Sequence, residues 1–199
     1  MSLRSSVLAA VVLSATVSST SSAAILIFTD QFLYDANTSL YARSSENFAS
    51  YSGAYASLNG AAGAVNWSAG ATGGVNVTAG RLASSSPTAL TISFAGPDVY
   101  GVSGNFFGTD ASSNVVPSLV LVSLSDGTSY LNLIDTATVF VGFVSTGAAI
   151  TGIQVTAQAF PSGSPSAFAT VDNLGFAYVP APGAVALLGL AGLAARRRR

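Results

Sequence analysis

Apolar residues alternate with smaller or polar ones at residues 90–95, and this pattern constrains the fold more than any other feature. Leu90, Ile92 and Phe94 hold the apolar positions. Because successive side chains of a strand point to opposite faces, the spacing predicts a β-strand with one buried face. Six further strands are predicted after it: Val99–Phe107, Leu119–Leu124, Tyr130–Leu133, Thr138–Val144, Ile150–Ala159 and Phe168–Tyr178. Between two of them, Asp126-Gly127 predicts a hairpin turn.

The residues before this region are less regular. Ile25–Thr29 is a short β-rich run that suits a first strand. Over Asp30–Arg43 the spacing becomes helical, which predicts a short helix with Asp30 as its N-cap. The apolar face of that helix would contain Phe32, Leu33, Ala36, Leu40 and Tyr41.

Residues 46–80 are rich in Gly, Ala, Ser and Asn, a composition that also occurs in disordered segments. Their spaced aromatic residues favour strands joined by loops instead. Three short strands are predicted here: Phe48–Tyr51, Val65–Ser68 and Val75–Thr78. Asn59-Gly60 and Gly73-Gly74 are the predicted turns.

Many short strands with regular turns and almost no helix predict an all-β fold, an antiparallel β-sandwich. We expect one domain over residues 25–178, which is long enough to bury a core. The chain has no cysteine, so disulfides contribute nothing to its stability. Packing and hydrogen bonds must hold this domain together.

Residues 1–24 have the three parts of a secretory signal peptide. Arg4 supplies the positive charge, Val7–Val17 the apolar segment, and a run of Ser, Thr and Ala the cleavage region. Cleavage after Ala23 and cleavage after Ala24 both fit. The apolar segment is too short for a stable membrane span, so we expect an exported protein whose N-terminal signal helix is removed.

Residues 179–199 combine a proline turn, an apolar segment and a basic end. The turn motif consists of Val179, Pro180, Ala181, Pro182 and Gly183. The apolar segment, residues 184–195, contains Ala184, Val185, Leu187, Leu188, Leu190 and Leu193. The basic end consists of Arg196, Arg197, Arg198 and Arg199. The two prolines end the preceding strand and allow a helix to begin after them.

An apolar helix with no polar face suits a membrane better than the surface of a domain. The uncharged run is at the short end of the roughly 17–25 residues that a bilayer requires, and snorkelling arginines would extend it. The arginine cluster would stay on the cytoplasmic side. The alternative is a small buried helix at the end of a soluble domain.

The sequence VPAPGA followed by ALLGLAGLAARRRR resembles the PEP-CTERM sorting signal of bacterial surface proteins. That resemblance implies recognition by an exosortase, a membrane protease-transferase, and anchoring in the membrane before processing. The glutamate usual between the two prolines of the family is replaced by Ala181. The stretch from TISFAGPDVYGVSGNFFGTD to VDNLGF also resembles the jelly-roll-like body common in these proteins.

Composition excludes several classes of activity. Without histidine, cysteine or lysine, the chain cannot assemble a Ser-His-Asp or Cys-His site, a His-ligated zinc site or a Schiff base. Arg43 and Arg81 are the only cations of the predicted domain, against eight acids, so we expect no binding to nucleic acid. A pair of carboxylates, as in glycoside hydrolysis, is the remaining catalytic option, with Glu46 the first candidate. Aspartates at turns, among them Asp98, Asp110 and Asp126, have the simpler role of bonding to their own backbone.

Two binding features remain. Asp172 falls within a predicted strand, and its carboxylate would either bond to neighbouring backbone N–H groups or help hold a structural calcium ion; we favour the first and predict no cofactor. Aromatic rings that are exposed could stack on sugars, and Trp67 is the best candidate for exposure. The full aromatic set is Tyr51, Tyr55, Trp67, Tyr100, Phe106 and Phe107.

The sequence therefore predicts a non-enzymatic protein of the cell envelope or extracellular matrix, sorted through its C-terminal segment. The alternative is a carbohydrate-binding module that acts on exopolysaccharide. Exposed aromatic residues on a concave sheet face would favour the alternative, whereas a face of Ser, Thr and Ala would favour a surface or matrix component.

Overall fold

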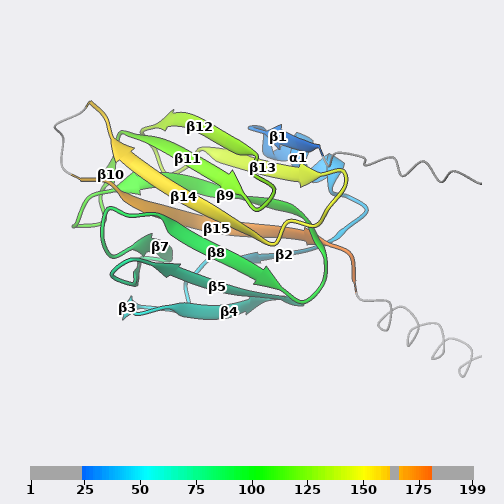
Figure 1. The fold of residues 1–199 in the computed structure, drawn as a ribbon, viewed down its shortest axis with the longest axis horizontal. Helices are drawn as coiled ribbons and strands as arrows, with labels where there is room; N and C mark the ends of the chain where they lie inside the picture. The colour runs from blue at the N-terminus through cyan, green and yellow to red at the C-terminus, as the bar shows by residue number, and fades with distance from the viewer. Residues whose placement is uncertain (1–23, 162–165, 181–199) are drawn as a thin grey trace, which may run out of the picture.

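The computed structural model describes residues 24–161 and 166–180, which form two antiparallel β-sheets packed face to face (Figure 1). The larger sheet has the order β1 (Ile25–Phe28), β13 (Phe140–Ser145), β9 (Val99–Thr109), β15 (Phe168–Tyr178), β7 (Arg81–Ser84), β6 (Val75–Thr78) and β3 (Gly53–Tyr55). Two short strands join it from the side: β10 (Val115–Val116) on β9 and β2 (Ala42–Glu46) on β15.

The smaller sheet has the order β12 (Ser129–Ile134), β11 (Ser118–Leu124), β14 (Gly152–Ala159), β8 (Leu90–Ala95), β5 (Val65–Ala71) and β4 (Leu58–Ala62). The inward-facing residues of both sheets form one hydrophobic core, which includes Ile92 from the smaller sheet and Phe143 from the larger one. The predicted all-β antiparallel sandwich is confirmed at this level. The strands expected at residues 90–95 and in the six segments after them are all present, although β13 and β14 each begin two residues later than predicted.

β15 lies at the centre of the larger sheet. It pairs with β9 along one edge, while β7 and β2 share its other edge. A bulge interrupts the β9 pairing between Asp172 and Gly175, where Asn173 adopts a left-handed φ of 52°. This last strand therefore carries a large part of the core, with Val171, Leu174 and Phe176 all buried.

The predicted helix is present but shorter, and it buries a different face. α1 spans Gln31–Asn37, and the Asp30 carboxylate caps it by accepting the Leu33 N–H at 3.0 Å. The predicted face was wrong: Phe32 and Leu40 are 78% and 97% exposed, and Tyr34 is the residue that faces the sheet. The Tyr34 ring fits against the sheet because Gly101 of β9 and Gly142 of β13 have no side chains there.

Two predictions for residues 46–62 were also wrong. Phe48–Tyr51 is a turn, in which Phe48 has a φ of 55° and the Glu46 carboxylate accepts its N–H at 2.8 Å. The turn inserts the Phe48 ring into the core, 5.4 Å from the ring of Trp67. Asn59-Gly60 lies within β4 and forms no turn, because the missing side chain of Gly60 makes room for the Trp67 indole beside it. The turn predicted at Gly73-Gly74 is present, with both residues at positive φ.

The expected signal helix and C-terminal apolar helix lie outside the described residues. Within 24–161 and 166–180, no helix has the length and apolar character that a membrane crossing requires.

Candidate functional site

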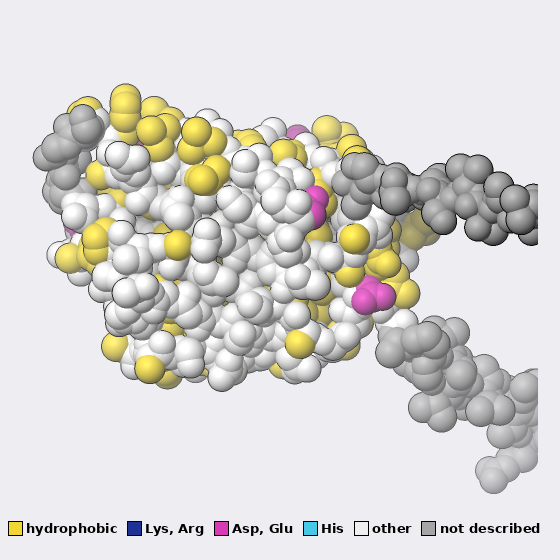
Figure 2. Space-filling view, in the orientation of Figure 1, with side chains coloured by type: hydrophobic (Ala, Val, Ile, Leu, Met, Phe, Trp, Pro, Cys, Tyr) yellow, Lys and Arg dark blue, Asp and Glu magenta, His cyan; other side chains and the backbone are white. Residues whose placement is uncertain are grey.

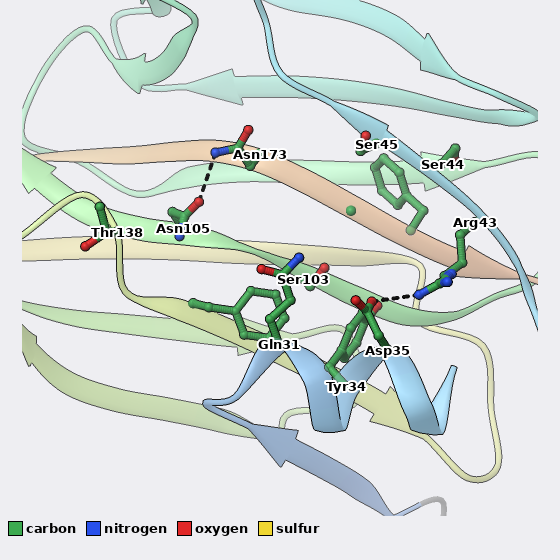
Figure 3. Close-up of a pocket in the computed structure, with 13 residues that line it drawn as sticks. Gln31, Tyr34, Asp35, Arg43, Ser44, Ser45, Ser103, Asn105, Thr138 and Asn173 are labelled. Atoms are coloured by element: carbon green, nitrogen blue, oxygen red, sulfur yellow. Dashed lines mark hydrogen bonds and ion pairs between the residues drawn. The ribbon is translucent and has the colours of Figure 1, made fainter. Parts of the chain in front are cut away.

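A polar groove of about 500 Å³ lies on the outer face of the larger sheet, between α1 and the strands beside it. We call it the α1 groove. In Figure 3 its residues project from α1 on one side and from β2, β9 and β15 on the other. Its polar lining is formed by Gln31, Asp35, Arg43, Ser44, Ser45, Ser103, Asn105, Thr138 and Asn173.

Tyr34 holds α1 over the sheet. Its ring lies against Gly142 of β13 and its hydroxyl against Gly101 of β9, where a Cβ would come within 2.8 Å of that oxygen. The ring also makes an edge contact with Phe140, with centroids 5.6 Å apart. Burial raises the pKa of the Tyr34 hydroxyl well above its usual value, against a smaller opposing effect of the neighbouring Ser103 hydroxyl, and no hydrogen bond of normal geometry reaches this buried oxygen within the described part of the chain. Packing, rather than hydrogen bonding, therefore fixes the wall of the groove.

The β15 bulge supplies part of the groove floor. It takes Asn173 out of the regular ladder, and the Asn173 amide donates to Asn105 Oδ1 at 3.1 Å. The Asn105 amide in turn donates to the Val139 carbonyl at 3.2 Å. These bonds orient two amides of the groove from separate strands.

The charges of the groove are paired. Arg43 of β2 contacts the Asp35 carboxylate of α1 at 2.7 Å, with each side chain about half exposed. No other charged residue is in the lining. The groove is therefore close to neutral and rich in hydroxyl and amide groups, which suits a neutral ligand that hydrogen-bonds.

Most of the predicted aromatic platform is buried. The prediction that Trp67 is exposed was wrong: the indole is 2% exposed, packed beneath the edges of Phe48 and Tyr51. Phe106 and Phe107 are core residues. Tyr51, Tyr55 and Tyr100 are half-buried. They lie in three different places: the turn before β3, β3 itself and β9, respectively. No sugar-stacking platform is formed by the predicted set.

The candidate carboxylates have structural partners. Glu46 is buried and bonds to the Phe48 N–H, as described above, while Asp172 accepts the N–H of Asn173 at 2.7 Å within the bulge. Asp126 accepts from the backbone and hydroxyl of Thr128 in the β11–β12 turn. The side-chain and backbone N–H groups of Asn114 hold the pKa of Asp110 below its usual value. Among the described residues, no group of three or more acidic, His or Cys side chains is placed to hold a metal ion.

The predicted sorting motif begins directly after β15. The N–H of Val179 donates to the Asp98 carbonyl at 3.0 Å, and Val179 and Pro180 follow β15 on the surface. The other predicted sorting, membrane and basic residues, from Ala181 to Arg199, lie outside the described residues, as does Ala23. Ala24 is described, and its carbonyl accepts both the N–H and the hydroxyl of Thr146 at 3.0 Å.

The outer face of the smaller sheet is also polar. A shallow depression across β4, β5, β8 and β14 is lined largely by hydroxyl and amide side chains, among them Asn59, Ser68, Thr91, Ser93 and Gln154. Figure 2 shows this face as largely free of acidic and basic side chains, with hydrophobic atoms at its rim. It has no aromatic lining residue.

No direct signal for the α1 groove is present in the sequence. Its residues come from segments far apart in the chain, and the bulge that places Asn173 is invisible in the alternation of side chains. Comparison of the chain with protein-family models, curated proteins and solved structures finds no match.

Proposed function

We propose that the chain is an exported, non-enzymatic protein of the cell envelope or extracellular matrix, delivered and retained through its C-terminal segment. In this proposal residues 1–23 or 1–24 are a signal peptide that is removed. Residues 184–195 enter the membrane as a helix, Arg196–Arg199 stop its transfer, and an exosortase-type enzyme acts at the proline motif.

One observation carries the proposal: β15 ends at Tyr178, directly before the predicted sorting motif. After β15, the N–H of Val179 still bonds to the Asp98 carbonyl, one residue before Pro180. Because β15 is paired along both edges, a force or covalent attachment at this point acts on the best-held strand of the domain. The sorting segment can therefore be inserted, cut or transferred without unravelling the sandwich.

The chemistry of the surface supports a non-enzymatic role. The α1 groove contains one carboxylate, Asp35, and this is paired with Arg43. Two-carboxylate hydrolysis requires a second acid about 5–10 Å away. The face of Ser, Thr and Asn on the smaller sheet is the pattern expected of a surface component rather than of a sugar-stacking module. A jelly-roll arrangement belongs to the same proposal, supported by the chain's repeated crossing between the two sheets from β8 to β15.

The tail is tested by two changes in the exporting cell. Replacing Arg196–Arg199 with serine removes the stop to transfer, so we expect loss of envelope retention and an altered mass of the mature chain. A chain that ends at Tyr178 is the control for complete release. Wild-type processing and location of the serine variant would contradict the sorting proposal.

A second change addresses the departure from the family pattern. Ala181→Glu restores the acidic residue between the two prolines, and Ala181→Gln is its uncharged control. If the glutamate is what an exosortase of the common type reads, only the first variant should be processed by such an enzyme in a heterologous host. Equal processing of all three chains would show that the residue between the prolines is not read.

The α1 groove favours a second candidate function, binding of a neutral segment of exopolysaccharide. Its hydroxyl and amide groups, with a balanced ion pair, match the hydrogen-bonding needs of sugar hydroxyls. In calorimetry against oligosaccharides chosen from a glycan array, Gln31→Ala should weaken binding several-fold. Asn59→Ala on the opposite sheet is the control, and equal affinity of both variants and wild type would exclude the groove.

A further inference from the structure

Exposed hydrophobic side chains gather at one end of the domain. Of the nine large hydrophobic residues that the described residues expose, six belong to this group, which we call the apolar end: Leu26, Ile27, Phe32, Leu33, Leu40 and Val179. Leu40 and Phe32 are 97% and 78% exposed. Single exposed apolar residues are ordinary on a soluble domain, whereas a concentration of them marks a contact surface.

The strand register places the apolar end beside the exit of the chain from β15. Ala42 pairs with Tyr178, so the turn that contains Leu40, two residues earlier in the chain, leads into β2 at the end of the sheet where β15 finishes. On the other side, Leu26 pairs with Val144, which is linked through Gly101 to Ala177. Leu26 is thus three strand spacings of about 4.8 Å from Ala177, near the end of β15. α1, which carries Phe32 and Leu33, packs against β1 and β13.

Figure 1 shows the same arrangement, with the start of β1, α1 and the end of β15 together at the right. In Figure 2, hydrophobic atoms gather on the right side of the domain, together with a few acidic side chains. The apolar end therefore lies on the side of the domain where β15 ends.

Aromatic and charged groups at this end fit a lipid interface. The rings of Tyr41 and Tyr100 stack with centroids 5.8 Å apart, and Tyr41 is adjacent to Leu40 in the chain. Tyrosine is enriched where membranes meet water because its ring is apolar and its hydroxyl is polar. Arg43 is paired with Asp35, and Arg81 lies over the Phe107 ring. The charge of Arg43, which pairs with Ala177 at this end, is thus balanced by a carboxylate, and the exposed Asp98 beside Val179 adds a negative charge.

We propose that the apolar end rests in the interfacial layer of the bilayer that holds the C-terminal segment, so that the sandwich stands on this end. The inference depends on the proposed insertion of residues 184–195. Only residues 181–183 separate Pro180 from that segment, a reach of about 10 Å even when fully extended. The tether therefore keeps Leu40 and Val179 near the surface and raises their effective concentration there. The contact is apolar rather than electrostatic and should form on zwitterionic lipid.

The absence of cysteine in the chain permits a direct test. Leu40→Cys and Phe32→Cys are prepared in the full chain, labelled with an environment-sensitive fluorophore, and reconstituted into phosphatidylcholine vesicles with and without brominated acyl chains. Leu131→Cys on β12 is the matched control, because that side chain is 62% exposed but lies on the outer face of the smaller sheet. Circular dichroism verifies that each labelled chain keeps its β fold.

We expect the brominated lipid to reduce the fluorescence of the labels at 40 and 32 about two-fold, as for side chains about 5–10 Å into the interface, and to leave the label at 131 nearly unchanged. If the chain floats with the vesicles but all three labels respond alike, the docked orientation is wrong while membrane anchoring stands. If the chain does not float with the vesicles, the anchoring proposal fails and the inference with it. The labels at 40 and 32 could instead shift to the blue without being quenched by brominated lipid, and lose that shift on dilution. This result would assign the surface to contact with a second copy of the chain, which also overturns the inference.

Discussion

The packing of Tyr34 on Gly142 makes a prediction that can be worked out from geometry. A methyl group at Gly142 would overlap the Tyr34 ring, with Cγ and Cε2 both at 2.9 Å and Cδ2 closer still. The backbone of Gly142 is not in the left-handed region, so alanine is excluded by space rather than by φ. Gly142→Ala should therefore lower the free energy of unfolding by about 1–3 kcal/mol through overpacking.

The same geometry predicts strong coupling between the two positions. Tyr34→Ala alone should lower the free energy of unfolding by about 3–5 kcal/mol, as for other large buried rings. In that background the Gly142 methyl enters the space left by the ring, so Gly142→Ala should become neutral or slightly stabilising. The coupling free energy should then be about 1–3 kcal/mol, within the range of residues in contact.

Urea unfolding of the four chains of this cycle, followed by circular dichroism, measures the coupling. Gly70→Ala is the matched control, because a Cβ there meets nothing within 4 Å and its backbone is also outside the left-handed region. That control should change stability by less than about 0.5 kcal/mol or raise it slightly. Additive effects of Gly142→Ala and Tyr34→Ala would refute the direct packing of the Tyr34 ring on Gly142 and, with it, the account of how the groove wall is fixed.

Four further outcomes are expected. Tyr34→Phe removes a buried hydroxyl without a partner, so it should be neutral or stabilise by about 1 kcal/mol at pH 7. Because the folded-state pKa of Tyr34 is raised, wild-type stability should be intact below the unfolded-state pKa of about 10 and fall as the pH rises above it. A pH series of melts should show a smaller fall for Tyr34→Phe than for wild type. A domain that begins at Ala24 should be about 1–2 kcal/mol more stable in urea than one that begins at Ile25, since only the first keeps the carbonyl that accepts from Thr146. Phe94→Ala should lower the free energy of unfolding by about 2–3 kcal/mol, less than for a fully buried ring, because Phe94 is half-buried against Phe176. Melting scans of wild type in EDTA and in millimolar calcium should coincide. A calcium-dependent shift that Asp172→Ala abolishes would instead assign a metal ion to the bulge.

Local patterns predicted the later strands well because their environment is regular. Leu90 and Ile92 alternate on the inner face of a sheet, and that period is visible in the sequence without any knowledge of the partner strands. The Asp30 cap and the Asp126-Gly127 turn were predicted for the same reason, since both depend on bonds within a few residues.

The errors concern residues whose role depends on distant contacts. Gly60 resembled a turn residue, but its lack of a side chain serves the Trp67 ring on the next strand. Phe48 resembled a strand residue, whereas the Glu46 carboxylate stabilises it in a left-handed turn. Phe32 was assigned to the buried face because helical spacing shows period and not direction. The α1 groove was missed for a related reason, because β2, β9 and β15 meet only in three dimensions.

The position of β15 has a consequence for the order in which this protein can fold. Leu174 pairs with Glu46, so the central strand of the larger sheet closes a contact that spans most of the domain in sequence. Long-range pairing of this kind is slow, because loop closure must precede the contacts that stabilise it. Until residues 168–178 have been synthesised, β2, β7 and β9 lack their common partner, and the core lacks the buried side chains that β15 contributes. If the chain is exported as proposed, threading from its N-terminus would leave the larger sheet incomplete until β15 emerges on the far side, with residues 181–199 following directly behind it.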